Sequence, residues 1–284
     1  MNKRCPQPVI LGTGFLHPAG TAAEIRDHMA RNTALAMRDN WDPTPQLGTL
    51  FPIGQLRRIP MYARMGLQAA VMALNDAKLF PCPEDTGLVI GSSWGCQKTS
   101  CDFMDSILDN GPRLSSPMAF SHAVNNMAAG LISLMLKIKG PCFTINNQEL
   151  SFAGALQTGI TLLKNRRCAY ALVGALDEAD ARLRRVFPSM PMLPGAFFVC
   201  LALRGRGVSA DVRWPAERRN DNSVIHTRDT QDELNLSSLP GDALKQALGC
   251  ALALEYLKQG ADAARIVQAA AITGTQACIS LKII

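Results

Sequence analysis

The stretch Gly140-Pro-Cys-Phe-Thr-Ile-Asn-Asn-Gln-Glu-Leu-Ser-Phe-Ala-Gly154 decides the fold. Its first part, Cys142–Ile145, consists of small, aromatic or β-branched residues, as a buried strand requires. Asn146 and Asn147 interrupt this run and tolerate the backbone angles of a turn. Apolar residues then recur at helical spacing from Leu150 onward. The stretch therefore predicts a strand, a tight turn and a helix.

Such a strand-to-helix elbow carries a nucleophile in many enzymes. The turn lifts one side chain clear of the backbone, and the helix N-terminus stabilises developing negative charge. In this chain the residue at the tip is Gln148 or Glu149, and neither is a cysteine or a serine. The sequence thus predicts the frame of an active site without its nucleophile.

Length and composition indicate a folded chain with a large core. The chain has 284 residues, of which 48% are hydrophobic and 18% are charged, as is typical of a globular protein. The net charge of +6 is modest, and the basic residues are scattered without interleaved aromatic residues. We therefore expect no nucleic-acid partner. No apolar run is long enough to predict a membrane span.

The nine cysteines form no CxxC pair, and most lie in apolar runs, where cysteine behaves as a small hydrophobic residue. Without an apparent signal peptide, this usage is typical of the reducing cytoplasm. The histidines His17, His28 and His122 are isolated. Gly12 and Gly14 lack the third glycine of a dinucleotide-binding motif. We therefore expect neither a metal nor a cofactor.

Apolar periodicity predicts strands that alternate with helices along the rest of the chain. Strands are expected over 8–20, 88–93, 170–175, 265–272 and 277–284, and a strand pair over 195–203 and 209–214. Helices are expected over 61–79, 102–109, 124–136 and 243–258. Irregular segments are expected over 32–56, 115–122, 182–194 and 215–240. This alternation implies an α/β protein with a largely parallel sheet.

The order of elements recurs in shortened form after Gly195, which favours two related halves over two independent domains. We expect a single domain over residues 1–284. Its N-terminal half covers residues 1–180, and an abbreviated C-terminal half covers residues 195–284.

Seven segments, in the same order along the chain, resemble the β-ketoacyl synthase family. They are Val9–Gly20, Arg64–Leu79, Gly87–Ser93, Ser116–Gly130, Lys139–Pro141, Gly174–Asp177 and Ile272–Lys282. The resemblance is continuous from Pro8 to Asp177 and patchy beyond. It implies a thiolase-like α/β fold with two related βαβαβ halves in a layered α-β-α-β-α arrangement, the second half being shortened.

The departures from the family concern its chemistry. The family attacks an acyl thioester with a cysteine on the elbow, assisted by two histidines. Counted from Gly140-Pro141, the nucleophile position falls on Glu149, and Cys142 lies too early to replace it. One histidine position resembles Gly241-Asp242, and His226 is a weak alternative for a catalytic histidine. The resemblance therefore implies no catalytic residue in this chain.

A Cys-less subgroup of the family acts as the chain length factor of type II polyketide, aryl-polyene and related systems, beside an active ketosynthase. The resemblance to it implies a heterodimer, with an acyl carrier protein docking through the partner. The implied interface strand consists of Cys142, Phe143, Thr144 and Ile145. The implied neighbours of the acyl tunnel are Met118, Phe120, Asn125, Asn126 and Met127, with Gln148 and Glu149 at the elbow.

Two other functions stay open from the sequence. One is a divergent condensing or malonyl-decarboxylating enzyme that uses Glu149. The other is a homodimeric scaffold or binding protein descended from a synthase. Under the non-catalytic hypothesis, Glu149 fills the vacated position and hydrogen-bonds to backbone amides. The run Arg182–Arg185 is interpreted as a solvated face, with carrier-protein docking as the alternative.

Overall fold

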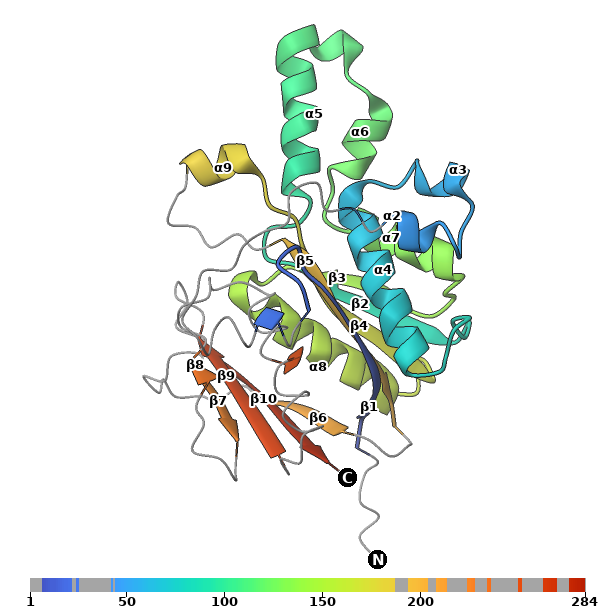
Figure 1. Ribbon diagram of the computed structural model, residues 1–284, viewed down its shortest axis with the longest axis vertical. Helices are drawn as coiled ribbons and strands as arrows, with labels where there is room; N and C mark the ends of the chain where they lie inside the picture. Colours follow the sequence, from blue (N-terminus) through green and yellow to red (C-terminus); the bar gives the residue numbers. More distant parts are fainter. Residues whose placement is uncertain are drawn as a thin grey trace, which may run out of the picture.

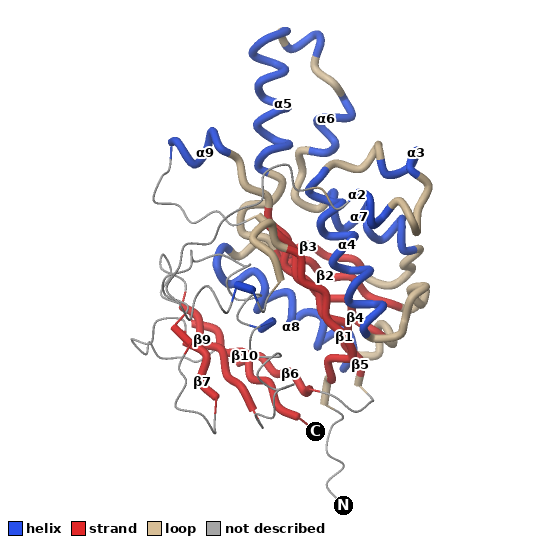
Figure 2. The backbone as a smooth tube through the Cα atoms, in the orientation of Figure 1, coloured by secondary structure: helices blue, strands red, loops and turns tan. Residues whose placement is uncertain are grey.

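The computed structural model describes residues 7–21, 24–25, 42, 44–186, 194–203, 208–213, 224–227, 234–235, 250–251, 263–269 and 276–283. Within these residues one hydrogen-bonded sheet runs through the molecule, with helices packed against it (Figure 1). Helices α5 and α6 project away from the sheet (Figure 2).

The described strands form a sheet in the order β3-β2-β4-β5-β1-β6-β10-β9-β7-β8. Their bounds are β1 Val9–Leu16, β2 Thr86–Gly91, β3 Cys142–Ile145, β4 Tyr170–Asp177, β5 Gly195–Ala202, β6 Val208–Arg213, β7 Val224–Thr227, β8 Leu234–Asn235, β9 Ala263–Ala269 and β10 Gln276–Ile283. Strand β3 lies at one edge of the sheet, where β2 is its neighbour.

The prediction of a largely parallel sheet is wrong. Strand β2 is parallel to β3 and to β4, whereas the other described pairs are antiparallel. A parallel neighbour requires a crossover that returns the chain to the starting end of the sheet. The link from β4 to β5 does not return it, because Asp177 at the end of β4 pairs with Gly195 at the start of β5.

Strands β5 and β6 were expected to pair with each other, and this prediction is also wrong. Strand β1 lies between them and pairs antiparallel with both, over its length with β5 and through Val9 and Ile10 with β6. The first strand of the chain is therefore internal to the sheet.

The helices have the bounds α2 Thr44–Leu47, α3 Ile53–Leu56, α4 Met61–Asp76, α5 Gln97–Asn110, α6 Pro117–His122, α7 Met127–Leu136, α8 Ser151–Lys164 and α9 Ala181–Val186, with 3-10 turns η1 Pro112–Leu114 and η2 Gln148–Leu150. Helix α4 packs on β1 and β5, whereas α8 packs on β2 and β4 and also reaches β6 and β10. Helix α8 thus lies between the two parts of the bent sheet (Figure 1).

Successive residues of β5 belong to two different hydrophobic cores. Phe197, Val199 and Leu201 join the core around α8, whereas Phe198 and Cys200 join the core around α4 and α7. Side chains alternate between the two faces of a strand, so β5 is buried on both faces. This explains why its sequence is a continuous apolar run.

Two glycines of β1 allow α4 to approach the sheet closely. A Cβ atom on Gly14 would overlap the carbonyl oxygen of Ala69, and one on Gly12 would overlap backbone atoms of Ala73 and Ala77. The pair Gly12 and Gly14 therefore serves helix packing.

Several local predictions differ from the structure. The expected loop over 115–122 contains α6, whose N-cap Ser116 accepts a hydrogen bond from the amide of Ala119 and is followed by Pro117; both features favour a helix start. Short helices α2 and α3 lie within 32–56, α9 covers the first residues of 182–194, and β7 and β8 lie within 215–240. The helix expected over 243–258 lies outside the described residues except for 250–251.

Candidate functional site

The predicted elbow is present. Strand β3 leads through the turn at 146–147 into η2 and then into α8. Gln148 stands at the tip with a φ of 47°, in the left-handed region that a residue with a side chain adopts at a cost. The local backbone is therefore held by its surroundings.

Serine hydroxyl groups provide this support. The carbonyl oxygen of Gln148 lies 2.6 Å from Ser93 Oγ and 2.6 Å from Ser151 Oγ. Ser151 Oγ also accepts a hydrogen bond from the amide of Asn147 at 2.8 Å and lies 3.0 Å from the carbonyl oxygen of Ser92. These contacts join the elbow to the loop that follows β2.

Glu149 occupies the position that follows the tip. Its side chain is partly buried, and its Oε2 atom is buried without a hydrogen-bond partner among the described residues. The expected hydrogen bonds from backbone amides to this oxygen are therefore absent from the described part of the chain. An unpaired carboxylate oxygen in a buried position is costly.

A carboxylate that the sequence analysis did not single out organises the floor of the elbow. Asp177, at the end of β4, is fully buried. Its Oδ1 atom accepts hydrogen bonds from Ser92 Oγ at 2.7 Å, from the Trp94 amide at 2.8 Å and from the Gly95 amide at 3.2 Å, and its Oδ2 atom accepts one from the Ser93 amide at 3.2 Å. Asp177 thereby fixes the Ser92–Gly95 loop beneath the elbow.

The buried surroundings of Asp177 disfavour the ionised form of its carboxyl group. Burial raises the pKa of this carboxyl from 3.8 to about 6, although the hydrogen bonds from Trp94, Ser92, Ser93 and Gly95 act in the opposite direction. The sequence does contain a signal for this role, because Asp177 directly ends the apolar run of β4. A carboxylate in such a position is buried and therefore needs hydrogen-bond donors close by.

Tyr62 of α4 completes this network. Its hydroxyl group lies 3.2 Å from Ser92 Oγ and 3.2 Å from the carbonyl oxygen of Leu176. Burial, followed by the nearby Asp177, raises the pKa of Tyr62. Ser92 is fully buried, and its Oγ atom donates to Asp177 and accepts from the Gly95 amide, so this hydroxyl group serves the hydrogen-bond network and is not presented to a substrate.

Arg182 forms ion pairs with three carboxylates. Its guanidinium group binds Asp180 and Asp102, at 2.6 and 2.7 Å respectively, and also Asp105. These partners, Asp180 first, raise the pKa of Arg182. Arg182 thus ties the start of α9 to α5, while its side chain still exposes 40% of its surface.

The residues expected near an acyl tunnel lie on α6 and at the start of α7. Met118 and Phe120 are exposed, at 62% and 60% of their surfaces, whereas Met127 is buried in the core. Met118 lines a cavity of about 390 Å³ together with Met61, Phe103 and other residues of α4–α6. The ring of Phe120 packs on that of Phe103, with 5.6 Å between the centroids.

The remaining predicted residues have separate positions. Asn125 and Asn126 are exposed, and the side chain of Asn125 lies against Gly95. His226 lies in strand β7 opposite Arg265 of β9, where the sequence suggested a loop. Asp242 lies outside the described residues.

The edge strand β3 is accessible. Cys142 and Phe143 are exposed, Phe143 at 46% of its surface, and Thr144 and Ile145 are partly exposed. An edge strand with unpaired backbone groups is a template for pairing with another chain.

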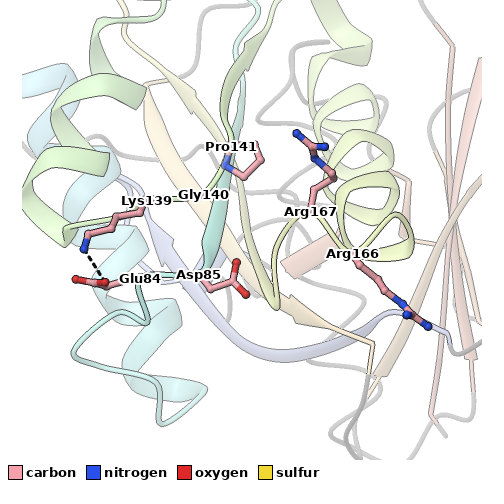
Figure 3. A pocket seen from close by; sticks show the side chains of 7 residues that line it. All are labelled: Glu84, Asp85, Lys139, Gly140, Pro141, Arg166 and Arg167. Atoms are coloured by element: carbon pink, nitrogen blue, oxygen red, sulfur yellow. Dashed lines mark ion pairs between the residues drawn. The ribbon is translucent and has the colours of Figure 1, made fainter.

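A charged pocket of about 720 Å³ lies at the opposite end of the parallel strands, where β2, β3 and β4 begin (Figure 3). Lys139 pairs with Glu84 at 2.7 Å, while the side chains of Arg166 and Arg167 point away from each other (Figure 3). The pocket carries charges of both signs and contains none of the predicted site residues.

Among the residues that the structure describes, no group of three or more His, Cys, Asp or Glu side chains could hold a metal ion. In the same part of the chain, no helix has the length and apolarity needed to cross a membrane.

The layered sheet with a strand–turn–helix elbow defines a protein of the thiolase-like fold, and structural comparison supports this class. The chain aligns with "The ishigamide ketosynthase/chain length factor" at 17% identity and a TM-score of 0.72, covering 98% of this chain and 99% of that chain. It aligns at 14% identity and a TM-score of 0.74 with the structure titled "AntDE:AntF (apo): type II PKS acyl-carrier protein in complex with its ketosynthase bound to the hexaketide", covering 99% of this chain and 100% of that chain. At these identities the likeness shows the fold.

Residues 20–194, more than half of the chain, match the profile of the family described as "Beta-ketoacyl synthase, N-terminal domain", and the chain belongs to this family. The 3-oxoacyl-[acyl-carrier-protein] synthase 2 of Rhizobium meliloti (strain 1021) is 29% identical over 158 residues, which cover 47% of this chain and 38% of that protein. The synthase of the same name from Coxiella burnetii (strain RSA 493 / Nine Mile phase I) is 27% identical over 194 residues, covering 66% and 40% respectively. The chain thus spans about two fifths of the length of these relatives.

Proposed function

We propose that this chain is a non-catalytic ketosynthase-like subunit that pairs with an active β-ketoacyl synthase and helps to shape its acyl tunnel, as a chain length factor does. The observation that carries the proposal is the elbow, which is intact in its backbone but bears Gln148 and Glu149 where the family bears a nucleophilic cysteine. A carboxylate at a helix N-terminus is stabilised as an anion and is a poor acyl acceptor.

Exposed apolar side chains on β3, α5 and α6 support the pairing. Phe143 on β3 and Met118 and Phe120 on α6 are exposed, as are Met104 and Leu108 on α5. Large apolar surfaces of this kind mark protein interfaces. In the proposed complex β3 pairs with the partner, Met118 and Phe120 face the acyl or polyene chain, and an acyl carrier protein docks through the partner subunit. The proposed compartment is the cytoplasm, as the cysteine usage predicts.

Co-expression with a complete β-ketoacyl synthase encoded beside this gene tests the proposal. We expect the two chains to co-purify as a stable complex with equal amounts of each chain. A monodisperse monomer without affinity for any ketosynthase would contradict the proposal. If the chain forms a homodimer and does not bind the neighbouring ketosynthase, the result would support the homodimeric scaffold instead.

The unpaired Oε2 atom of Glu149 favours one second candidate, a malonyl-decarboxylating enzyme. In this reaction the bond between the carboxylate and the α-carbon of the malonyl group breaks, carbon dioxide leaves, and the resulting enolate takes a proton from a water molecule, which the Glu149 carboxylate would orient by accepting its hydrogen bond. The purified chain, alone and with its partner, should then convert a malonyl thioester to the acetyl thioester. Turnover that is absent, or unchanged in Glu149→Gln, removes this candidate.

A further inference from the structure

An apolar groove of about 940 Å³ lies at the C-terminal end of α7, away from the elbow. Residues around α3, residues of the 80–84 segment and the second half of α7 line it. We call it the α3–α7 groove. None of the residues expected near the acyl tunnel lines this groove. The groove is therefore separate from the proposed acyl tunnel.

The floor of the groove is an open face of the core around α4 and α7. Phe51, Phe80, Leu131 and Met135 line the groove and pack from a partly buried position against the core around α4 and α7. Leu134 also lines the groove and exposes 73% of its surface. A concave apolar surface of this size is typical of a site for a small molecule with a hydrophobic body.

The charges of the lining are not balanced. Arg58 and Lys137 are exposed residues of the groove lining, and no ion pair joins either of them to a described carboxylate. Glu84, the acidic residue among the lining residues, is already paired with Lys139 at 2.7 Å, as Figure 3 shows. The groove therefore combines an apolar floor with two available cations, and this combination is complementary to an amphipathic anion.

We propose that the α3–α7 groove binds a single-chain aliphatic carboxylate, with its tail on the apolar floor and its carboxylate held by Arg58 and Lys137. The carbonyl groups at the end of α7 do not oppose an anion strongly, because the amides of Lys137 and Ile138 cap those of Leu134 and Ser133. The groove requires no contribution from a second chain, so this inference is independent of the proposed pairing with a ketosynthase.

Titration calorimetry of the full chain with dodecanoate, below its micelle concentration and near neutral pH, tests the proposal. We expect saturable binding to one site. Decanoate and octanoate should bind more weakly by roughly three- to fourfold for each methylene removed, because each buried methylene contributes a nearly constant free energy. Dodecyltrimethylammonium has the same tail with the opposite charge and should bind at least tenfold more weakly than dodecanoate.

The double variant Arg58→Gln/Lys137→Gln should weaken dodecanoate binding at least tenfold. Its matched control is Arg57→Gln, since Arg57 is an exposed neighbour of Arg58 that does not line the groove. Leu134→Asp places a negative charge on the wall and should also weaken binding. All these side chains are exposed, so folding should be preserved, and circular dichroism with thermal unfolding checks this.

Three results would overturn the proposal: no binding of dodecanoate, equal binding of the cationic amphiphile, or equal binding by the double variant and the Arg57→Gln control. If dodecanoate does not bind and Leu134→Asp dissociates a self-complex, the groove is covered by a second copy of the chain. Failure of co-purification with a ketosynthase would contradict the proposed function but would leave this result unaffected.

Discussion

At the scale of single residues, Asp177 combines full burial with four hydrogen-bond donors. In Asp177→Asn the side-chain oxygen can replace Oδ1 as an acceptor. The side-chain NH₂ group then takes the place of Oδ2 and faces the backbone N–H of Ser93, so two hydrogen-bond donors oppose each other and the N–H loses its acceptor. We expect this substitution to lower the free energy of unfolding by about 1–3 kcal/mol near neutral pH. Urea unfolding measures the change. Asp109→Asn, at an exposed position on α5, is the control and should have little effect.

The same residue gives a pH dependence with a definite sign. Its pKa in the folded chain, about 6, is above the ordinary value of 3.8, so the folded state holds the proton more tightly than the unfolded state. The contribution of Asp177 to the free energy of unfolding is therefore largest near pH 4 and falls as the pH rises through about 6, by up to about 3 kcal/mol. The advantage of the wild type over Asp177→Asn should shrink in this range. An advantage that stays constant or grows would refute the assignment.

At the scale of elements, the contact of α4 with β1 depends on glycine. Gly14→Ala places a methyl group on the carbonyl oxygen of Ala69, and overpacking of this kind costs about 1–3 kcal/mol. Gly130→Ala is the matched control, because a Cβ atom there would meet no atom within 4 Å and alanine favours a helix by about 0.5–1 kcal/mol. Thermal unfolding should show a lower midpoint for Gly14→Ala and an equal or higher one for Gly130→Ala.

The edge strand β3 carries a prediction about assembly. Phe143 exposes 46% of its surface, so Phe143→Lys should leave the unfolding of the isolated chain nearly unchanged. In the proposed complex the same substitution buries an unpaired charge, and we expect its dissociation constant to rise at least tenfold. Val186→Lys, at an exposed apolar position on α9, is the control. Analytical ultracentrifugation of mixtures would measure both, and equal affinities for the two variants would exclude β3 from the interface.

Local patterns predicted the elements better than their pairing. The strand Cys142–Ile145, the helix from Met61 and the strand from Tyr170 were predicted from runs of residues whose character depends on local backbone geometry. The direction of β5 and the insertion of β1 between β5 and β6 depend on contacts between residues far apart in the chain, on which periodicity carries no information. The role of Asp177 was missed for the same reason, since its donors come from the Ser92–Gly95 loop.

At the scale of the whole molecule, two buried groups act oppositely on stability. Burial lowers the pKa of His17 from 6.5 to about 4, so the unfolded state holds this proton more tightly and stability rises with pH between these values. Asp177 has the reverse effect over nearly the same range. Their contributions should nearly cancel in the wild type.

Single and double variants separate the two contributions. The advantage of the wild type over His17→Asn should grow as the pH rises from about 4 to 6.5, whereas the double variant with Asp177→Asn should show a profile as flat as that of the wild type. The asparagine keeps an acceptor for the Ala19 amide, which now donates to Nδ1 of His17. Chemical denaturation across this pH range is the measurement, and parallel profiles for all four proteins would contradict the opposing signs.

The division into the halves 1–180 and 195–284 stays a prediction. Strand β1 from the first half pairs with β5 and β6 from the second, so neither half has a complete sheet alone. The two predicted halves therefore share their hydrogen bonds along β1.

The internal position of β1 also bears on how the chain is made. A ribosome translates Val9–Leu16 well before the strands on both of its sides, which begin only at Gly195 and Val208. Until then α4, which packs on β1, is the main element that can shield this apolar segment, and sheets that wait for distant partners are slow to form and prone to aggregate. The sheet around β1 is thus completed only after residues 195–213 have been translated, and a nascent chain that stalls before residue 195 leaves β1 open to chaperones.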